Sequence, residues 1–190
     1  MVMQRRTFLQ ISLPVALTGY AGAAKSGKPL LSFGVLADPQ YADVNTAGSR
    51  FYRNSLAKLK AAVVELNKHE LEFVVTLGDV IDRNFSSFDD ILPLYKPLKA
   101  PSKLVLGNHD FDMADEDKGK VMGKLGLERG YRAETVGDWY FIYLDGTDVS
   151  TFRYGKTAPE TVAAQKTLDG MKKKKRSQAR PWNGSLGGSR

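Results

Sequence analysis

Three short runs of mainly apolar residues lie along the chain, and each ends in a cluster of polar side chains. The runs cover residues 31–37, 73–77 and 103–106, and their Val, Leu and Phe content predicts buried β-strands. Side chains that follow parallel strands meet at one edge of the sheet. The pattern therefore predicts one site built from three loops, which begin at Asp38-Pro39-Gln40, Gly78-Asp79 and Gly107-Asn108-His109-Asp110.

The segments between these runs have helical or hairpin patterns. Apolar residues recur at helical spacing, and a Gly-Asp pair separates two further strand-like runs. The order β-α-β-α-β followed by a hairpin predicts an α/β (α+β) fold, with a mixed sheet and helices packed on it. The predicted helices are 51–68, 91–95, 113–125 and 158–175, and the hairpin strands are 131–136 and 139–144.

Composition narrows the class of protein. The chain has 190 residues, of which 42% are hydrophobic and 26% are charged, which is typical of one globular domain. It has no cysteine, which excludes disulfides and thiolate metal sites and suits an oxidising compartment. The net charge of +7 is carried entirely by residues 171–190, so a basic surface over the domain is not predicted.

The basic run Lys172–Arg176 has two interpretations. It could bind nucleic acid or another anionic surface, or it could be a solvated helix end or an insertion loop near an anionic substrate. No aromatic interleaving or known nucleic-acid motif accompanies the run. We therefore do not expect a nucleic-acid partner.

The N-terminal residues have the pattern of an export signal. Arg5 and Arg6 precede Phe-Leu, a mild apolar run and the small residues 21–24. This is typical of a signal peptide, and the run is too short for a stable membrane anchor. The paired arginines resemble the twin-arginine signal, so we expect a signal peptide at 1–23, a linker at 24–30 and a periplasmic or extracellular location. The alternative is a basic N-terminal extension.

The polar residues at the three strand ends form a donor set for divalent metals. Asp38, Asp79 and Asn108 offer hard oxygen ligands, while Gln40 and His109 add an amide and an imidazole. Such donors suit Mn²⁺, Fe or Zn²⁺. The strand before Asp79 should lie between the other two, so Asp79 is placed to bridge two ions. Each motif alone is more often a turn or a surface loop, but the three in order are specific.

These motifs resemble a known family. Asp38-x-Gln40, Gly78-Asp79-x-x-Asp82-Arg83 and Gly107-Asn108-His109-Asp110 look like the first three blocks of the calcineurin-like metallophosphoesterases. Residues 37–43 and 144–148 are similar to the manganese-dependent ADP-ribose/CDP-alcohol diphosphatase branch, in which Gln replaces the usual His. The resemblance covers residues 31–188 and implies a mixed β-sheet or sandwich flanked by helices.

The resemblance also implies an activity and its ligands. The expected reaction is hydrolysis of a phosphodiester or pyrophosphate bond in a small nucleotide-like molecule. Two divalent ions would activate the attacking hydroxide, and Mn²⁺ is the metal expected before Fe or Zn²⁺. Asp38 and Gln40 would bind the first metal and Asn108 the second, while Asp79 would bind both.

The resemblance assigns further roles around these ligands. His109 would act on the phosphate as general acid or hydrogen-bond donor, and Asp110 would orient it. Asp82 and Arg83 would hold their loop together, with substrate contact by Arg83 as a minor interpretation.

The sequence departs from the family in its histidines. The family completes its metal centre with histidines from later strands, whereas this chain has only His69 and His109. His69 lies near a predicted helix end, where a solvated capping role is expected. We therefore expect a truncated N-terminal part of the domain with impaired hydrolysis, or completion by a partner segment or chain. The alternative is a non-catalytic remnant that binds metal weakly. A module that binds an anionic polymer is the third hypothesis.

Overall fold

The computed structural model describes residues 30–177, with side chains up to Lys173. The predicted signal peptide and nearly all of the linker lie outside the described residues. The segment 178–190, which includes the end of the family resemblance, also lies outside them. No helix within the described part of the chain is long and apolar enough to cross a membrane.

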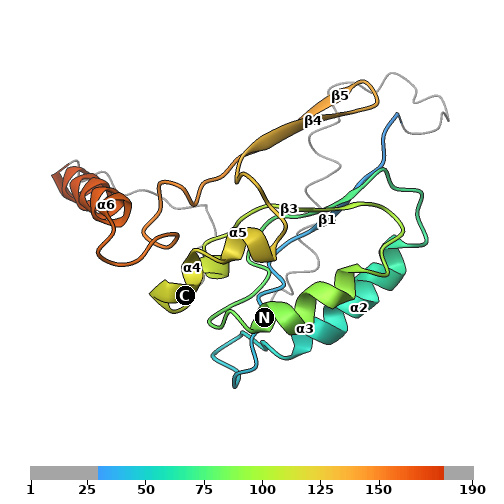
Figure 1. Cartoon of the computed structure of the whole chain (residues 1–190), viewed down its shortest axis with the longest axis horizontal. Coiled ribbons are helices and arrows are strands. Elements are labelled where there is room, and N and C mark those ends of the chain that lie inside the picture. Colours follow the sequence, from blue (N-terminus) through green and yellow to red (C-terminus); the bar gives the residue numbers. More distant parts are fainter. Residues whose placement is uncertain (1–29, 178–190) are drawn as a thin grey trace. The chain divides into compact units, whose positions relative to one another are not determined.

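A three-stranded parallel sheet forms the centre of the fold (Figure 1). Its strands are β1 (Gly34–Leu36), β2 (Val74–Thr76) and β3 (Ser102–Leu104), in the order β1-β2-β3. Val75 pairs with Val35 on one side and with Lys103 on the other. The three strand predictions are confirmed, and β2 is the central strand, as was expected from the sequence.

Helices from the two crossover connections pack on one face of this sheet. They are α2 (Asn54–Leu66), α3 (Ser87–Ile91) and the 3-10 helix η1 (Leu92–Tyr95). The main core lies between them and the sheet, where Phe88 and Ile91 are fully buried. Burial of one such side chain stabilises the folded state by roughly 1.5–3 kcal/mol.

The helix predicted at 91–95 differs in its bounds from the structure. It begins earlier, at Ser87, and continues as a 3-10 helix from Leu92 to Tyr95, which contains Pro93.

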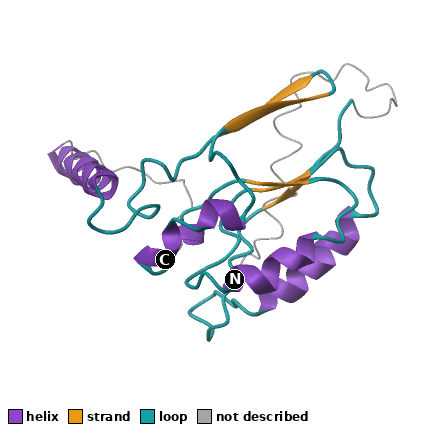
Figure 2. Ribbon diagram, in the orientation of Figure 1, coloured by secondary structure: helices purple, strands orange, loops and turns teal. Residues whose placement is uncertain are grey.

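A β-hairpin packs on the other face of the sheet. Its strands are β4 (Arg132–Val136) and β5 (Trp139–Tyr143), and Gly137 has the positive φ of 57° that the tight turn needs. Phe141 lies edge-on to Phe73, with ring centroids 4.9 Å apart. The hairpin is thus a separate two-stranded sheet stacked on the parallel one. The expected mixed β-sheet or sandwich flanked by helices is confirmed, and Figure 2 shows the parallel and the antiparallel strands as two separate sets.

The helix predicted at 113–125 is broken into two short helices. They are α4 (Asp115–Lys118) and α5 (Val121–Lys124), and Gly119 lies between them. Glycine lowers helix stability by about 1 kcal/mol relative to alanine, and a second glycine occurs at 123. Lys118 also donates to the backbone carbonyl of Tyr154 at 3.1 Å, so tertiary contacts determine where α4 lies.

The last described helix, α6 (Pro159–Ser177), confirms the prediction at 158–175. It contains the whole basic run Lys172–Arg176, and the side chains of Lys172 and Lys173 are exposed to solvent. This agrees with a solvated helix end.

The loops that follow β2 and β3 are fastened by the carboxylate of Asp110. This residue lies in the 3-10 helix η2 (His109–Phe111), and its side chain is fully buried. One oxygen accepts from the N–H groups of Val80 and Ile81 at 2.7 and 3.3 Å. The other accepts from Asp79 and Gly107 at 3.0 and 2.9 Å. Burial raises the pKa of Asp110 to about 6, although the hydrogen bonds from Gly107, Ile81 and Val80 oppose this rise.

We predict that Asp110→Ala destabilises the protein by at least about 3 kcal/mol, because buried N–H groups lose their acceptor. Chemical denaturation followed by circular dichroism measures this loss. The matched control is Asp112→Asn, whose half-exposed side chain accepts no such bonds and whose change should stay within about 0.5 kcal/mol. Equal stabilities for the two variants would show that Asp110 does not fasten the loops.

Candidate functional site

Two glycines let the loops after β2 and β3 approach each other closely. Gly78 has a φ of 77°, and a Cβ added to it would lie only 2.5 Å from the backbone nitrogen of Gly107. A Cβ on Gly107 would collide with the backbone and carboxylate of Asp79. No larger residue fits at either position, so the glycines permit the contact between these loops.

The loops after β1 and β2 continue the pairing of their strands. The N–H of Gln40 donates to the carbonyl of Asp79 at 2.8 Å, and the N–H of Asp82 donates to the carbonyl of Tyr41 at 2.8 Å. These bonds hold the loops together beyond the last residues of β1 and β2.

Four non-glycine residues in these loops have left-handed backbone conformations. They are Asp38, Gln40, Asp79 and Arg83, with φ values between 48° and 77°. Such a conformation costs roughly 1–2 kcal/mol for an L-residue. Residues in strained conformations cluster at functional sites, where the surrounding structure imposes them. The strain therefore coincides with three of the four predicted metal ligands.

Asp38, Gln40 and Asp79 come together as predicted from the sequence. The amide nitrogen of Gln40 lies 3.3 Å from one carboxylate oxygen of Asp79, and the other oxygen accepts from the N–H of His109 at 2.8 Å. Burial raises the pKa of Asp38, and contact with the carboxylate of Asp79 raises it further. Two adjacent carboxylates repel each other, so this geometry favours a bound cation.

Asn108 precedes His109 at the same edge of the sheet and is half-buried. Its amide offers an oxygen donor of the same hard type as those of the two aspartates and Gln40. The donor set at the three strand ends therefore fits a hard divalent ion such as Mn²⁺.

The imidazole of His109 is held by Asp82. Its Nδ1 lies 3.2 Å from one oxygen of the Asp82 carboxylate, whose side chain is 1% exposed. The prediction that Asp110 orients His109 is not what the structure shows, because the carboxylate of Asp110 is occupied by backbone N–H groups. Asp82 was expected only to hold its loop, and motif spacing alone did not indicate its contact with His109.

A third residue, Asp112, lies near this pair. Its carboxylate is 3.9 Å from Nδ1 of His109, and ligand atoms of Asp82, His109 and Asp112 lie within 4.8 Å of one another. Sequence reasoning missed Asp112. Its position three residues after His109, in an acidic turn, is the only signal that could have indicated it.

The other predicted residues lie outside this cluster. Arg83 is exposed and donates to the hydroxyl of Tyr52 at 3.2 Å, so its contact with substrate stays a prediction. His69 follows the end of α2, where its exposed side chain lies 3.8 Å from Glu65.

Residues 144–148 form a turn that is tied to the region of the site. The buried carboxylate of Asp145 accepts from the N–H and hydroxyl of Thr147 at 2.9 and 2.6 Å and pairs with Arg153. The guanidinium of Arg153 lies 5.8 Å from the ring centroid of Phe111. Since Phe111 ends the turn that carries His109, the motif at 144–148 supports that turn from outside.

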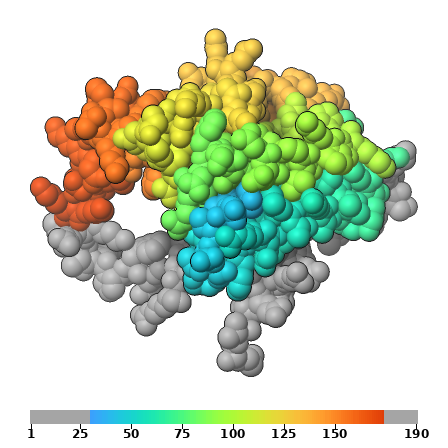
Figure 3. All heavy atoms as spheres, turned by 60° about the horizontal axis from the view of Figure 1, so that its bottom comes forward, coloured from blue at the N-terminus to red at the C-terminus, as the bar shows by residue number. Residues whose placement is uncertain are grey.

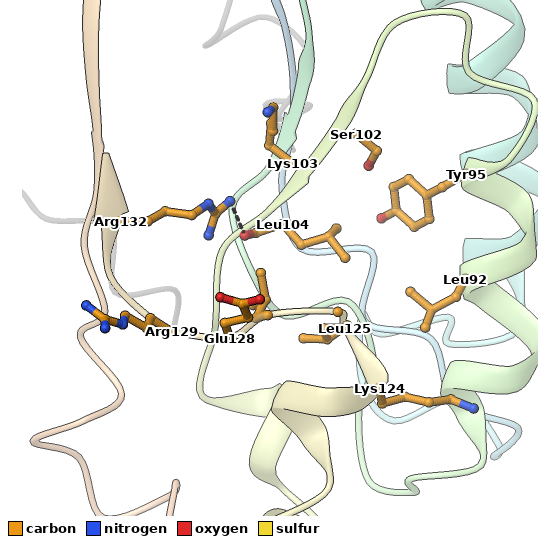
Figure 4. A pocket seen from close by; sticks show the side chains of 12 residues that line it. Leu92, Tyr95, Ser102, Lys103, Leu104, Lys124, Leu125, Glu128, Arg129 and Arg132 are labelled. Atoms are coloured by element: carbon orange, nitrogen blue, oxygen red, sulfur yellow. Dashed lines mark hydrogen bonds between the residues drawn. The ribbon is translucent and has the colours of Figure 1, made fainter. Parts of the chain in front are cut away.

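A cavity of about 720 Å³ lies elsewhere, along the outer edge of β3 (Figure 4). Leu92, Leu104 and Leu125 form its apolar part, and Arg132 donates to the carbonyl of Leu104 at 2.9 Å. Its lining contains none of the predicted site residues. The strand-end loops, not this cavity, carry the candidate chemistry.

Comparison with known proteins agrees with this geometry. The family model described as calcineurin-like phosphoesterase matches residues 31–187. A manganese-dependent ADP-ribose/CDP-alcohol diphosphatase of Arabidopsis thaliana is 31% identical over an alignment of 157 residues, and the match covers 75% of this chain and 50% of the relative. The protein of the same name from Oryza sativa is 30% identical over an alignment of 172 residues, and the match covers 82% of this chain and 53% of the relative.

A solved structure supports the same fold. A dimetal phosphatase from Danio rerio superposes with a TM-score of 0.63 at 22% identity, over 75% of this chain and 52% of that one. The chain spans about half the length of the curated relatives that it matches most extensively. The family match covers most of the sequence and includes all three strand-end loops, so the chain belongs to the calcineurin-like phosphoesterase family.

Proposed function

We propose that this chain carries the metal-binding loops of a phosphoesterase that hydrolyses a phosphodiester or pyrophosphate bond in a small nucleotide-like molecule. The observation that carries the proposal is the pair of adjacent carboxylates, Asp38 and Asp79, beside an imidazole held by Asp82. Substrates such as ADP-ribose and CDP-alcohols, which are named for the relatives, are the first candidates.

Asp38, Gln40, Asp79 and Asn108 would hold two divalent ions, with Asp79 between them. Mn²⁺ is the first choice because the relatives are named as manganese-dependent, and Fe or Zn²⁺ suit the same donors. When bound, such a pair of ions binds a phosphate ester and lowers the pKa of water so that hydroxide attacks phosphorus.

His109 is positioned to assist the leaving group. A hydrogen bond from Nδ1–H to Asp82 fixes the ring orientation and leaves Nε2 for a second partner. In the protonated imidazole, Nε2–H can donate a hydrogen bond to a phosphoryl oxygen or a proton to the departing oxygen. Asp82 would then stabilise the positive charge of the ring.

A second candidate function is metal binding without hydrolysis. The described residues bring one imidazole, that of His109, to the candidate centre. A metal held mainly by oxygen donors would bind more weakly than one with further imidazoles. A partner segment or second chain that supplies imidazoles would convert this binding site into a hydrolase.

We also propose that the protein is exported by the twin-arginine route, because Arg5 and Arg6 precede an apolar run and small residues. Replacing both arginines with lysine should abolish export of the full chain while its cytoplasmic level persists. Fractionation and immunoblotting measure this, with Arg53→Lys as a matched control outside the signal. Unchanged export of the double variant would remove the proposal.

The bridging role of Asp79 predicts a large loss of metal affinity in Asp79→Asn. Removing one charge from ligands shared by two ions should weaken Mn²⁺ binding by at least about tenfold. Titration calorimetry of the full chain measures the affinity, and Asp138→Asn in the hairpin turn is the control. Unchanged affinity in Asp79→Asn would show that Asp79 is not a ligand.

The proposed reaction predicts Mn²⁺-dependent hydrolysis of bis-p-nitrophenyl phosphate and ADP-ribose by the full chain. Asn108→Ala should reduce the rate to background, because the second ion loses its amide ligand. Hydrolysis that is unchanged in Asn108→Ala would contradict the site. A folded chain that binds Mn²⁺ and hydrolyses neither compound would favour the second candidate function.

A further inference from the structure

Arg50 lies beside the candidate metal centre, although no motif in the sequence includes it. Its Nη1 donates to one oxygen of the Asp82 carboxylate at 3.2 Å, and His109 occupies the other oxygen. We infer that Arg50 is a substrate-binding residue that holds a phosphate oxygen of the ligand next to His109. This inference rests on the proposed function and names a residue that it does not use.

The backbone of Arg50 is held by a tight turn. Ala47 and Arg50 exchange two backbone hydrogen bonds at 3.0 and 3.2 Å, and Gly48 within the turn has a φ of 58°. Tyr52, two residues later, is buried. In Figure 3 the blue and cyan segment that contains this turn lies against the green segment that follows β2. The loop therefore presents the guanidinium from a fixed position, which lowers the entropy cost of binding.

The guanidinium retains donors for a ligand. It has five N–H groups, and among the described residues one side-chain bond, that to Asp82, engages them. The side chain is 46% exposed, so other N–H groups face solvent. A fork of parallel donors matches the oxygens of a phosphate, and arginine is the residue best suited to such contacts.

Two neighbouring arginines have other partners. Arg53 pairs with Asp43 and donates to Asn45 at 3.2 Å, and Arg83 lies over the ring of Tyr52. Neither pairs with Asp82, which holds His109. Arg50 contacts Asp82, whereas Arg53, three residues later, contacts Asp43. A substitution of Arg53 is therefore a matched control for the same substitution of Arg50.

The charge around the site explains why a cation is needed there. Asp38, Asp79 and Asp82 bring three carboxylates to the candidate site, and a bound phosphate would itself be anionic. The guanidinium of Arg50 forms an ion pair with one of these carboxylates, that of Asp82, at 3.2 Å. Its charge would reduce the repulsion between these carboxylates and the ligand.

The test measures binding of AMP, a nucleoside phosphate, to the full chain saturated with Mn²⁺. Titration calorimetry should show about a tenfold loss of AMP affinity in Arg50→Gln. Arg50→Lys keeps the charge but loses the fork, so its loss should be smaller. Arg53→Gln should bind AMP as the wild type does, and adenosine should show no dependence on Arg50.

The outcomes separate the two proposals. Wild-type affinity for AMP in Arg50→Gln, with Mn²⁺ affinity also retained, would overturn the assignment of Arg50 and leave the metal centre intact. Absence of Mn²⁺ binding by the wild-type chain would overturn both. Thermal melts check folding, and if Arg50→Gln does not fold, Arg50→Lys decides, because wild-type AMP affinity in that variant would contradict the inference.

Discussion

The carboxylate of Asp110 is the contact on which the candidate site depends. It accepts hydrogen bonds from four backbone N–H groups in the loops after β2 and β3, and so it fixes the distance between these loops. Gly78 and Gly107 have no side chains, and their loops can therefore approach each other without a steric clash. The position of Asp79 relative to Asn108 and His109 follows from these two constraints. Asp110 was predicted to orient the imidazole of His109, and it instead supports the backbone of the loops that carry Asp79 and His109.

The sequence predicted the parts of the site that depend on local pattern. A buried strand, a glycine and a polar residue recur, and because parallel strands present their carboxyl ends at one edge, Asp38 and Asp79 meet there. The order of the strands also follows from two crossover connections. These features need no knowledge of distances between loops.

Contacts between loops could not be predicted in the same way. Asp82 could have faced solvent, and only the folded positions of the loops bring Arg50 to one of its carboxylate oxygens and His109 to the other. The same holds for the break between α4 and α5, where two glycines weaken the helix and the bond from Lys118 to the carbonyl of Tyr154 determines its position. The hairpin was predicted correctly as a local element, but its stacking on the sheet depends on the packing of Phe141 against Phe73.

The left-handed conformations of Asp38, Gln40, Asp79 and Arg83 have a consequence for how such a sequence changes over time. Glycine at any of these positions would relieve backbone strain, so a selection for stability alone would favour it. Each such change would remove a predicted metal ligand or an arginine from the edge of the site. These four positions therefore mark where the demands of stability and of chemistry oppose each other, and they are the positions at which a thermostabilised variant should be left unchanged.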